Sequence, residues 1–362
     1  MSATTDSILS LVKTRQDLAK KIGKIKESKG TPIENVKVEE KLRQHAHLYS
    51  SLVGLEDKLA LALTNTLIES SKEVQRKQIF YGKIASFLRK RKIERVLIVG
   101  AGRMGGWFAS YFRSVGLEVI LFDKEENIAR KRAQELDCKH GTSIESMANE
   151  SDLVIVAVPI SETNREIDSL EKVVGNSLPQ AIIEVSSIKQ PIRNHKKAAV
   201  PIISIHPLFG ASSEHYEANT VVLIQDNKRK SDRDFELASG IFPHFRILQV
   251  SSKEHDKQMA FMLSLPHILA LSFGQVISHN RFQINDLMQT PSFIALKQLA
   301  TNVFEENPEV YYEIQSSNQF TPKVLRELIE AIQKLSWCVE QKDRSAFKKF
   351  VERSKKDKKA SS

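Results

Sequence analysis

The chain has little cysteine and no long apolar run. Its 362 residues include only two cysteines, Cys138 and Cys338, and no CxxC spacing. This excludes a disulfide scaffold and a cysteine-based metal site, and it favours a reducing cytoplasm. No apolar run reaches the roughly 18 residues of a membrane span. Because the opening "MSATTDSILSLVKTRQ" lacks a basic region followed by an apolar one, we expect no secretory signal. The lack of a long apolar run and the few cysteines lead us to expect no membrane partner and no bound metal.

The sequence also lacks the interleaved basic and aromatic residues of nucleic-acid-binding proteins, although its net charge is +10. The charge has two interpretations, nucleic-acid binding or attraction of small polyanionic substrates. Part of it lies in the tail "RSKKDKKASS", where five basic residues accompany one Asp. Such a run is typical of a solvated segment, so we expect no nucleic-acid partner.

A helical pattern extends from residue 6 to about residue 80. Asp6 is placed to cap the first helix, which Gly30 and Pro32 interrupt. Two further helices are expected at about 37–53 and 55–80, on either side of Gly54, and residues 81–92 form a basic helical connector. The first helix is expected to bury an apolar stripe of Ile8, Leu11, Val12, Leu18, Ile22 and Ile25.

The pattern changes at residue 95 to short β-branched runs such as "RVLIV", "EVILF", "AIIEV" and "PIISI". The first two flank a helix expected from Arg103 to Val115 and closed by Gly116, which makes a βαβ unit and indicates a buried parallel sheet. From residue 251 the pattern is helical again, broken at "TPSF" and "ENPE". We predict an α/β protein with a Rossmann-type domain at 93–250, an all-α N-terminal domain at 1–80, an all-α C-terminal domain at 251–355 and a basic tail at 356–362.

The segment "VLIVGAGRMGGWFASYF" places a GxGxxG pattern between a strand and a helix. The glycines permit a tight turn and close approach of a pyrophosphate, and the helix N-terminus supplies free N–H donors. Asp123 ends the next strand, where a carboxylate binds ribose hydroxyls and repels a 2′-phosphate. NAD is therefore the expected cofactor, although Lys124 would soften the preference over NADP. The predicted cofactor-binding residues are Gly100, Gly102, Arg103, Met104, Gly105 and Asp123.

Two later strands end in polar groups at the edge of the sheet where ligands bind in such folds. "AIIEVSSIK" leads to Ser187, and "PIISIHPLFG" leads to His206. A neutral imidazole, with an ordinary pKa of about 6.5, suits removal of a hydroxyl proton during hydride transfer. A second imidazole, His267, lies in an apolar helical run. It is either a hydrogen-bonded core residue or directed into the cleft between the domains.

The motifs "GAGRMGG", "DLVIVAVP", "EVSSIK", "HPLFG" and "EHDKQMAFMLSLPH" resemble, in order and spacing, the prephenate dehydrogenase family over residues 93–340. The resemblance implies NAD-dependent oxidative decarboxylation of prephenate to 4-hydroxyphenylpyruvate in tyrosine biosynthesis. It also implies a homodimer, dimerising through the C-terminal domain, that tyrosine inhibits. His206 would accept the ring-hydroxyl proton, Ser187 would hydrogen-bond that hydroxyl, and His267 would position the substrate. Arogenate, with an amino acid side chain in place of the keto acid, is the alternative substrate.

The family's usual substrate-binding Arg is absent from "TPSFIALKQLATNVFEENPEVYYEI", where Lys297 is the only cation. Lys297 is therefore the predicted anchor for a substrate carboxylate. A lysine would bind it as a point charge, without the bidentate geometry of an arginine.

Polar residues also converge in the N-terminal helices. Arg15 and Lys26 are three helical turns apart and project the same way, about 16 Å from each other. Ser71 and Gln75 lie close to the apolar face of the third helix. The alternative is that these long side chains reach solvent.

Residues 6–80 resemble the all-helical chorismate mutases, which convert chorismate to prephenate. The resemblance implies that Arg15 binds a substrate carboxylate and that Lys26 and Gln75 stabilise the ether oxygen. Glu39 would face a hydroxyl, and Asn35 and Ser71 would make further polar contacts. Such a rearrangement needs positioning and electrostatics without covalent chemistry.

Two departures accompany this resemblance. The Arg usually found just before the Glu is Val38, and the chain begins after the position of an earlier Arg that reaches into the partner's site. The domain is then either a working mutase with fewer cations or a non-catalytic domain that serves dimerisation.

Overall fold

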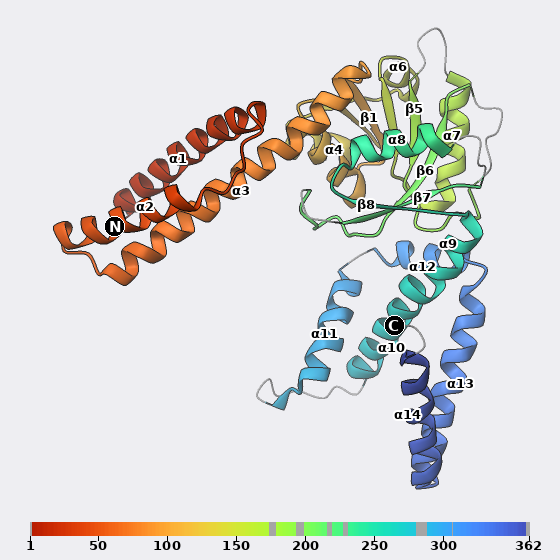
Figure 1. Ribbon diagram of the computed structural model, residues 1–362. Helices are drawn as coiled ribbons and strands as arrows, with labels where there is room; N and C mark the ends of the chain where they lie inside the picture. Colours follow the sequence, from red (N-terminus) through yellow and green to blue (C-terminus); the bar gives the residue numbers. More distant parts are fainter. Residues whose placement is uncertain are drawn as a thin grey trace.

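The computed structural model describes residues 2–173, 179–192, 199–215, 219–226, 231–279, 288–305 and 307–359. Three helices form an arm that projects from a central α/β part, and further helices lie beneath that part (Figure 1). This arrangement confirms the predicted fold class, a Rossmann-type sheet with helical N-terminal and C-terminal parts.

The arm consists of α1 (Ser2–Ser28), α2 (Val36–Val53) and α3 (Asp57–Lys90). Gly54 ends α2 in the left-handed conformation, at φ 68°, which glycine adopts without the steric cost that a Cβ would bring. Helix α3 continues through the predicted connector and packs against α4 (Arg103–Val115) and α8 (Ser231–Ile241). A single helix therefore joins the arm to the α/β part.

Two expectations about α1 are wrong. The helix begins at Ser2, so Asp6 lies inside it and is not its cap. The predicted apolar stripe is largely exposed, with Leu11 70% exposed, whereas Ala19 and Gly23 are buried against α3. Small residues make this contact because they let two helix backbones approach: a Cβ added at Gly23 would lie 3.3 Å from the Cα of Gln75.

The described strands form an eight-stranded sheet in the order β3-β2-β1-β4-β5-β6-β7-β8. Strands β1 to β6 are parallel, and the strand order reverses between β1 and β4. In open sheets of this kind, ligands bind beyond the carboxyl ends of the strands at such a reversal. The strands are β1 (Arg95–Val99), β2 (Glu118–Phe122), β3 (Lys139–His140), β4 (Leu153–Val156), β5 (Ala181–Glu184), β6 (Ile202–Pro207), β7 (Thr220–Ile224) and β8 (Arg246–Val250).

The expectation of a wholly parallel sheet is wrong at one end. Strand β7 runs antiparallel to β6, with His206 opposite Val222, and β8 then pairs parallel with β7. The sequence pattern missed β8 because this edge strand has no buried residue and so carries no continuous apolar run. Strand β6 also ends at Pro207, one residue beyond the imidazole.

Helices pack on both faces of the sheet, and Gly116 closes α4 as expected. Aromatic side chains of α4, led by Phe108 and Tyr111, form the core of one face together with Phe242 and with Ile84 of α3. The end of the long helix is therefore part of the α/β core. The other helices of this part are α5 (Glu126–Leu136), α6 (Ile144–Asn149) and α7 (Ile160–Val173).

The C-terminal part is helical, as predicted. Pro291 and Pro308 begin α11 and α12 at the expected breaks, where the missing N–H of proline costs no helical hydrogen bond. The helices are α9 (Ser252–Met259), the π-helical segment η2 (Ala260–Ser264), α10 (Leu265–His279), α11 (Pro291–Phe304), α12 (Pro308–Ser317), α13 (Thr321–Glu340) and α14 (Arg344–Lys359).

The continuous helix Ser252–His279 is long and apolar enough to cross a membrane by length and composition, although the sequence has no uninterrupted apolar run of that length. Only 17% of its most apolar window is buried within the chain. A core or interface helix of a soluble protein meets the same criterion, so one such helix is weak evidence for a membrane span.

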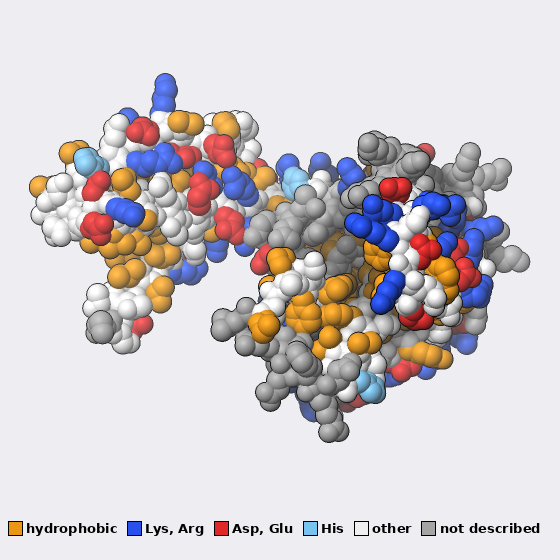
Figure 2. Space-filling model, turned by 90° about the horizontal axis from the view of Figure 1, so that it is seen from below, with side chains coloured by type: hydrophobic (Ala, Val, Ile, Leu, Met, Phe, Trp, Pro, Cys, Tyr) orange, Lys and Arg blue, Asp and Glu red, His pale blue; other side chains and the backbone are white. Residues whose placement is uncertain are grey.

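Apolar side chains gather on the surface of both helical parts (Figure 2). On the arm, Leu52 is 81% exposed, and on the C-terminal part Met262 is 69% exposed. Apolar areas of this kind usually mark an interaction surface.

Candidate functional site

The glycine-rich loop after β1 packs as closely as its pattern predicts. Gly100 has a φ of +100°, and a Cβ at Gly105 would lie 1.8 Å from the carbonyl oxygen of Gly100. No described atom lies within 4 Å of a Cβ added at Gly102. The chain itself therefore requires glycine at two of the three positions, while the third leaves open space at the N-terminus of α4, where unpaired N–H groups attract anions.

Asp123 directly follows β2 and is tied to this loop. Its Oδ2 accepts the N–H of Ala101 at 2.8 Å and its Oδ1 accepts the N–H of Glu125 at 3.0 Å. The neighbouring Lys124 forms an ion pair with Glu162 at 2.5 Å. The cation that would have drawn a 2′-phosphate thus already has a carboxylate partner.

The two residues between the last two glycines of the pattern differ in their surroundings. Met104 packs against the apolar core. Arg103 is exposed and lines a cavity of about 490 Å³, which Arg132 and His215 also line. This cavity lies beside the glycine-rich loop, and its described lining does not include His206.

His206 is buried at the end of β6 within a polar network. The residue is 6% exposed, and its Nδ1 lies 2.9 Å from Nε2 of His255. Nδ1 of His255 lies 2.7 Å from Oδ1 of Asp256. Burial, and then the nearby His255 and Lys189, hold the pKa of His206 well below its ordinary value. The imidazole is therefore neutral near pH 7 and able to accept a proton.

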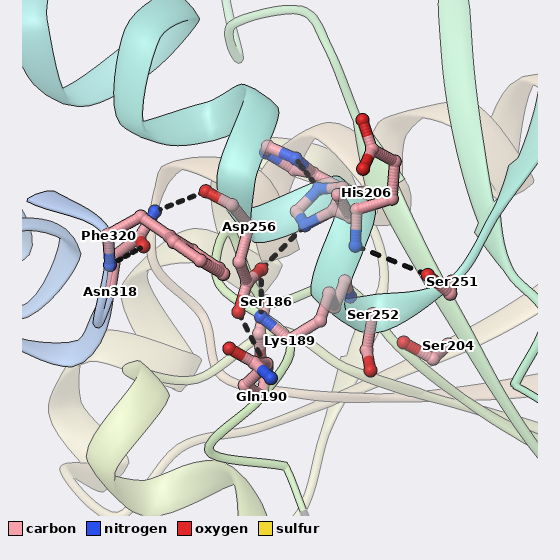
Figure 3. A network of polar contacts seen from close by, with 12 residues as sticks. Ser186, Lys189, Gln190, Ser204, His206, Ser251, Ser252, Asp256, Asn318 and Phe320 are labelled. Atoms are coloured by element: carbon pink, nitrogen blue, oxygen red, sulfur yellow. Dashed lines mark hydrogen bonds and ion pairs between the residues drawn. The ribbon is translucent and has the colours of Figure 1, made fainter.

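Asp256 joins α9 to the loop after β5 (Figure 3). Its carboxylate accepts the backbone N–H groups of Lys189 and Gln190, each at 2.8 Å. The Asn318 side chain donates to the Asp256 carbonyl at 2.7 Å. The two N–H groups fix the carboxylate and, through it, His255, whereas Asn318 holds only the backbone of α9.

A buried ion pair braces the same loop. Lys189 lies 2.8 Å from Oε1 of Glu184 and donates to the carbonyl of Ile205 at 2.7 Å, next to His206. The hydroxyl of Ser204 also bonds to Glu184, and the N–H of Ser186 donates to it at 2.8 Å. The charged ends of "EVSSIK" therefore hold β5 and β6 in register.

Ser187, half-buried in this loop, makes no hydrogen bond with another described residue. His267 packs edge-on against Tyr311, with the ring centres 4.6 Å apart, and burial lowers its pKa to about 4. Its Nδ1 has no partner among the described residues. Of the two interpretations, the unpaired Nδ1 favours a ring directed to a ligand over a fully hydrogen-bonded core residue. Lys297 is exposed on α11, so its role as substrate anchor stays a prediction.

In the arm, predicted site residues line the contact between α1 and α3. Nε of Arg15 donates to Ser71 at 3.2 Å. Gln75 is 6% exposed, and its Oε1 has no hydrogen-bond partner among the described residues. Nζ of Lys26 donates to the carbonyl of Ile33 at 2.5 Å. An acceptor buried without a partner is costly, which marks Gln75 as a group placed for a ligand.

Glu39 and Asn35 lie on or next to α2. Glu39 lies 3.5 Å from both Lys72 of α3 and Arg43 of α2. Asn35 caps α2 by accepting the N–H of Val38 at 3.2 Å. Its side chain therefore has a structural role that the sequence interpretation had not included.

Sequence reasoning missed the residues that surround these predicted groups. His255 and Asp256 stand inside the quoted "EHDKQMAFMLSLPH" segment, but their burial follows from α9 docking on the sheet. Lys72 was also missed. In the sequence His255 and Asp256 stand between the charged residues Glu254 and Lys257, so no local pattern signals their burial.

Comparisons with known proteins agree with this architecture. The family model for the nucleotide-binding domain of prephenate dehydrogenase matches residues 108–244, and the model for its dimerization domain matches residues 251–353. The model for chorismate mutase type II matches residues 2–76.

Individual relatives are distant. A "T-protein" of Haemophilus influenzae is 24% identical over 344 residues, covering 94% of this chain and 85% of the relative. A "Probable arogenate/prephenate dehydrogenase" of Methanocaldococcus jannaschii is 25% identical and covers 72% of this chain. The matched region spans 60% of that relative's length.

Among solved structures, prephenate dehydrogenase from A. aeolicus, in complex with hydroxyphenyl propionate and NAD+, aligns with a TM-score of 0.59. The identity is 18%, and the alignment covers 75% of this chain and 99% of that one. This likeness supports the fold. The chain therefore belongs to the prephenate dehydrogenase family and carries a type II chorismate mutase domain ahead of the two dehydrogenase domains.

Proposed function

We propose that the chain converts chorismate to prephenate in the arm and oxidatively decarboxylates prephenate to 4-hydroxyphenylpyruvate at the edge of the sheet. The observation that carries the dehydrogenase half is the buried, neutral His206 at the end of β6, in the same sheet as the glycine-rich loop. The three matching domain families support both halves.

The residues around the glycine-rich loop fit NAD. The space at Gly102 lets a pyrophosphate approach the N-terminus of α4. Each carboxylate oxygen of Asp123 accepts one backbone N–H and keeps a lone pair for a ribose hydroxyl. The pairing of Lys124 with Glu162 favours NAD over NADP. The nicotinamide supplies the hydride acceptor for the oxidation.

In this proposal His206 takes the proton of the substrate's ring hydroxyl as the carbon–hydrogen bond beside it breaks. Ser187 donates to or accepts from the same hydroxyl, which fits its lack of a hydrogen bond within the described chain. His267 turns its unpaired Nδ1 to the substrate. The carbon–carbon bond to the carboxylate then breaks, and its electrons make the ring aromatic, so no second base is needed.

In the arm, Arg15 binds a carboxylate of chorismate, and Lys26 and Gln75 stabilise the ether oxygen as its bond to carbon breaks. Gln75 sits between α1 and α3 with its carbonyl oxygen unpaired. Lys72, beside Glu39, adds a cation that compensates in part for Val38. This set supports a working mutase over a purely dimerising domain.

The chain is further proposed to act as a cytoplasmic homodimer. The match to a dimerization domain and the exposed apolar surfaces of both helical parts support a dimer. Feedback inhibition by tyrosine is also part of the proposal, because the family resemblance implies it.

The test is steady-state kinetics with the full chain, starting from chorismate and NAD and following NADH. Prephenate and arogenate are supplied in separate reactions to identify the substrate. Chorismate loss with no NADH from either substrate would refute the dehydrogenase half. NADH from prephenate, with chorismate lost only at the uncatalysed rate, would refute the mutase half.

A further inference from the structure

The three side chains His206, His255 and Asp256 form a linear chain of short contacts. Nδ1 of His206 lies 2.9 Å from Nε2 of His255, and Nδ1 of His255 lies 2.7 Å from Oδ1 of Asp256. All three are at least nine-tenths buried. Water therefore cannot easily reach these side chains and replace their hydrogen bonds to one another.

The acceptor at one end of this chain decides the direction of every bond. The Asp256 carboxylate accepts the N–H groups of Lys189 and Gln190 at 2.8 Å, which stabilises its charged form. A carboxylate only accepts, so Nδ1 of His255 carries a hydrogen. A neutral His255 then has its lone pair on Nε2. The 2.9 Å contact consequently requires Nδ1 of His206 to donate.

We propose that Asp256, acting through His255, holds His206 with its hydrogen on Nδ1, so that Nε2 is the atom that takes the substrate proton. The proposal rests on the proposed function of His206. In it, His255 and Asp256 are positioning residues that do not touch the substrate. Nε2 of His206 makes no hydrogen bond with a described residue, as a proton acceptor requires.

The proposed direction of the bonds requires a neutral His255. Lys189 already places a buried ammonium beside the network, from the loop after β5, and its counter-charge is Glu184. A doubly protonated His255 would add a second buried cation and would reverse the bond to His206. When His206 takes the proton at Nε2, its Nδ1–H still points at His255. The Asp256 charge then stabilises the new cation through one intervening imidazole.

Two substitutions test the His206–His255–Asp256 hydrogen bonds in the full-length enzyme. Asp256→Asn replaces the obligatory acceptor, and His255→Leu removes the intermediate ring. Each should lower the kcat of prephenate oxidation by about 10²–10⁴, the range seen when a general base loses its correct tautomer. The Kd for NAD should stay unchanged. His255→Gln, whose carbonyl can accept from Nδ1 of His206, should recover most of the turnover.

A direct readout is the ¹⁵N NMR signature of the His206 ring, which distinguishes the Nδ1–H form from the Nε2–H form. We expect Nδ1–H in the wild type and loss of that preference in both variants. Asn318→Ala is the matched control, because the Asn318 side chain bonds only backbone groups, the carbonyl of Asp256 and the N–H of Phe320. It should lower Tm while leaving kcat and the NMR signature intact.

The failures are distinguishable. Unchanged turnover in His206→Asn would overturn the proposed function itself. If His206→Asn is inactive while His255→Leu and Asp256→Asn keep wild-type turnover or the Nδ1–H signature, the positioning chain is wrong. Equal loss of kcat in Asn318→Ala would also contradict it, because general loosening of α9 would then explain the effect.

Discussion

The ammonium of Lys189 lies 2.8 Å from a carboxylate oxygen of Glu184, and neither side chain is more than 1% exposed. Removing one partner of such a pair leaves an uncompensated buried charge. We expect Glu184→Gln to lower the free energy of unfolding by about 3–5 kcal/mol, measured by urea denaturation. The double variant Glu184→Gln with Lys189→Met should recover much of this loss. An unchanged midpoint in the single variant would contradict the role of the pair.

The glycine-rich loop allows the effect of the fold to be separated from that of the ligand. Gly105→Ala should lower the free energy of unfolding by about 1–3 kcal/mol, since its Cβ would overlap the carbonyl of Gly100. Gly102→Ala should leave unfolding unchanged, because no described atom meets that Cβ, and should raise the Kd for NAD roughly tenfold or more. Urea denaturation checks the free energy of unfolding, and titration calorimetry checks the Kd. Unimpaired NAD binding by Gly102→Ala would place the pyrophosphate elsewhere.

His206→Asn removes the proposed base while keeping a polar side chain of similar width. Turnover of prephenate should fall by roughly 10² or more, and the Kd for NAD should be unaffected because the imidazole is apart from the glycine-rich loop. His279→Asn, which changes an exposed imidazole on α10, is the control and should behave as wild type. Comparable loss in both variants would argue against His206 as the base.

Arg15→Ala tests the arm independently of the sheet. It removes a guanidinium that donates to Ser71 at the α1–α3 contact, and mutase kcat/KM should fall by about 10²–10³, the usual effect of losing one stabilising donor. Dehydrogenase turnover of added prephenate should persist. The control, Lys13→Ala, removes only an exposed ion pair with Asp17. Retention of full mutase activity by Arg15→Ala would refute the placement of the site.

The contact between Tyr81 and His215 predicts a pH effect on stability. The Tyr81 hydroxyl lies 3.1 Å from Nδ1 of His215, and burial lowers the pKa of that imidazole from 6.5 to about 4. The unfolded chain therefore binds the proton first as the pH falls. Stability contributed by the neutral ring is complete above about pH 6.5 and is lost progressively down to about pH 4.

His215→Phe keeps the aromatic packing on Trp107 and Tyr111 and removes the titrating group. Its Tm should fall less than that of the wild type between pH 7 and pH 4.5. The buried His206 and His267 have pKa values shifted in the same direction, so some pH dependence should persist. Tyr81→Phe retains the imidazole and should keep most of the wild-type slope. Parallel Tm curves for His215→Phe and wild type would disprove the assignment.

Local pattern was sufficient for much of this molecule. The glycine spacing, the apolar strand runs and the helix from Arg103 to Val115 follow from backbone sterics and burial period, which are properties of neighbouring residues. The same local logic failed for the first helix. Apolar spacing predicts that Leu11 and Leu18 are buried, but the packed face is chosen by how closely Gly23 lets α1 approach α3.

The sequence by itself determined the fold class, the dinucleotide fingerprint and the presence of His206 at a strand end. Only the tertiary structure decided what that imidazole meets. His255 and Asp256 are 49 and 50 positions further along the chain, and no local period encodes their contact with β6. They come together because α9 docks where β5 and β6 end, and buried polar groups there must find hydrogen-bond partners within the chain.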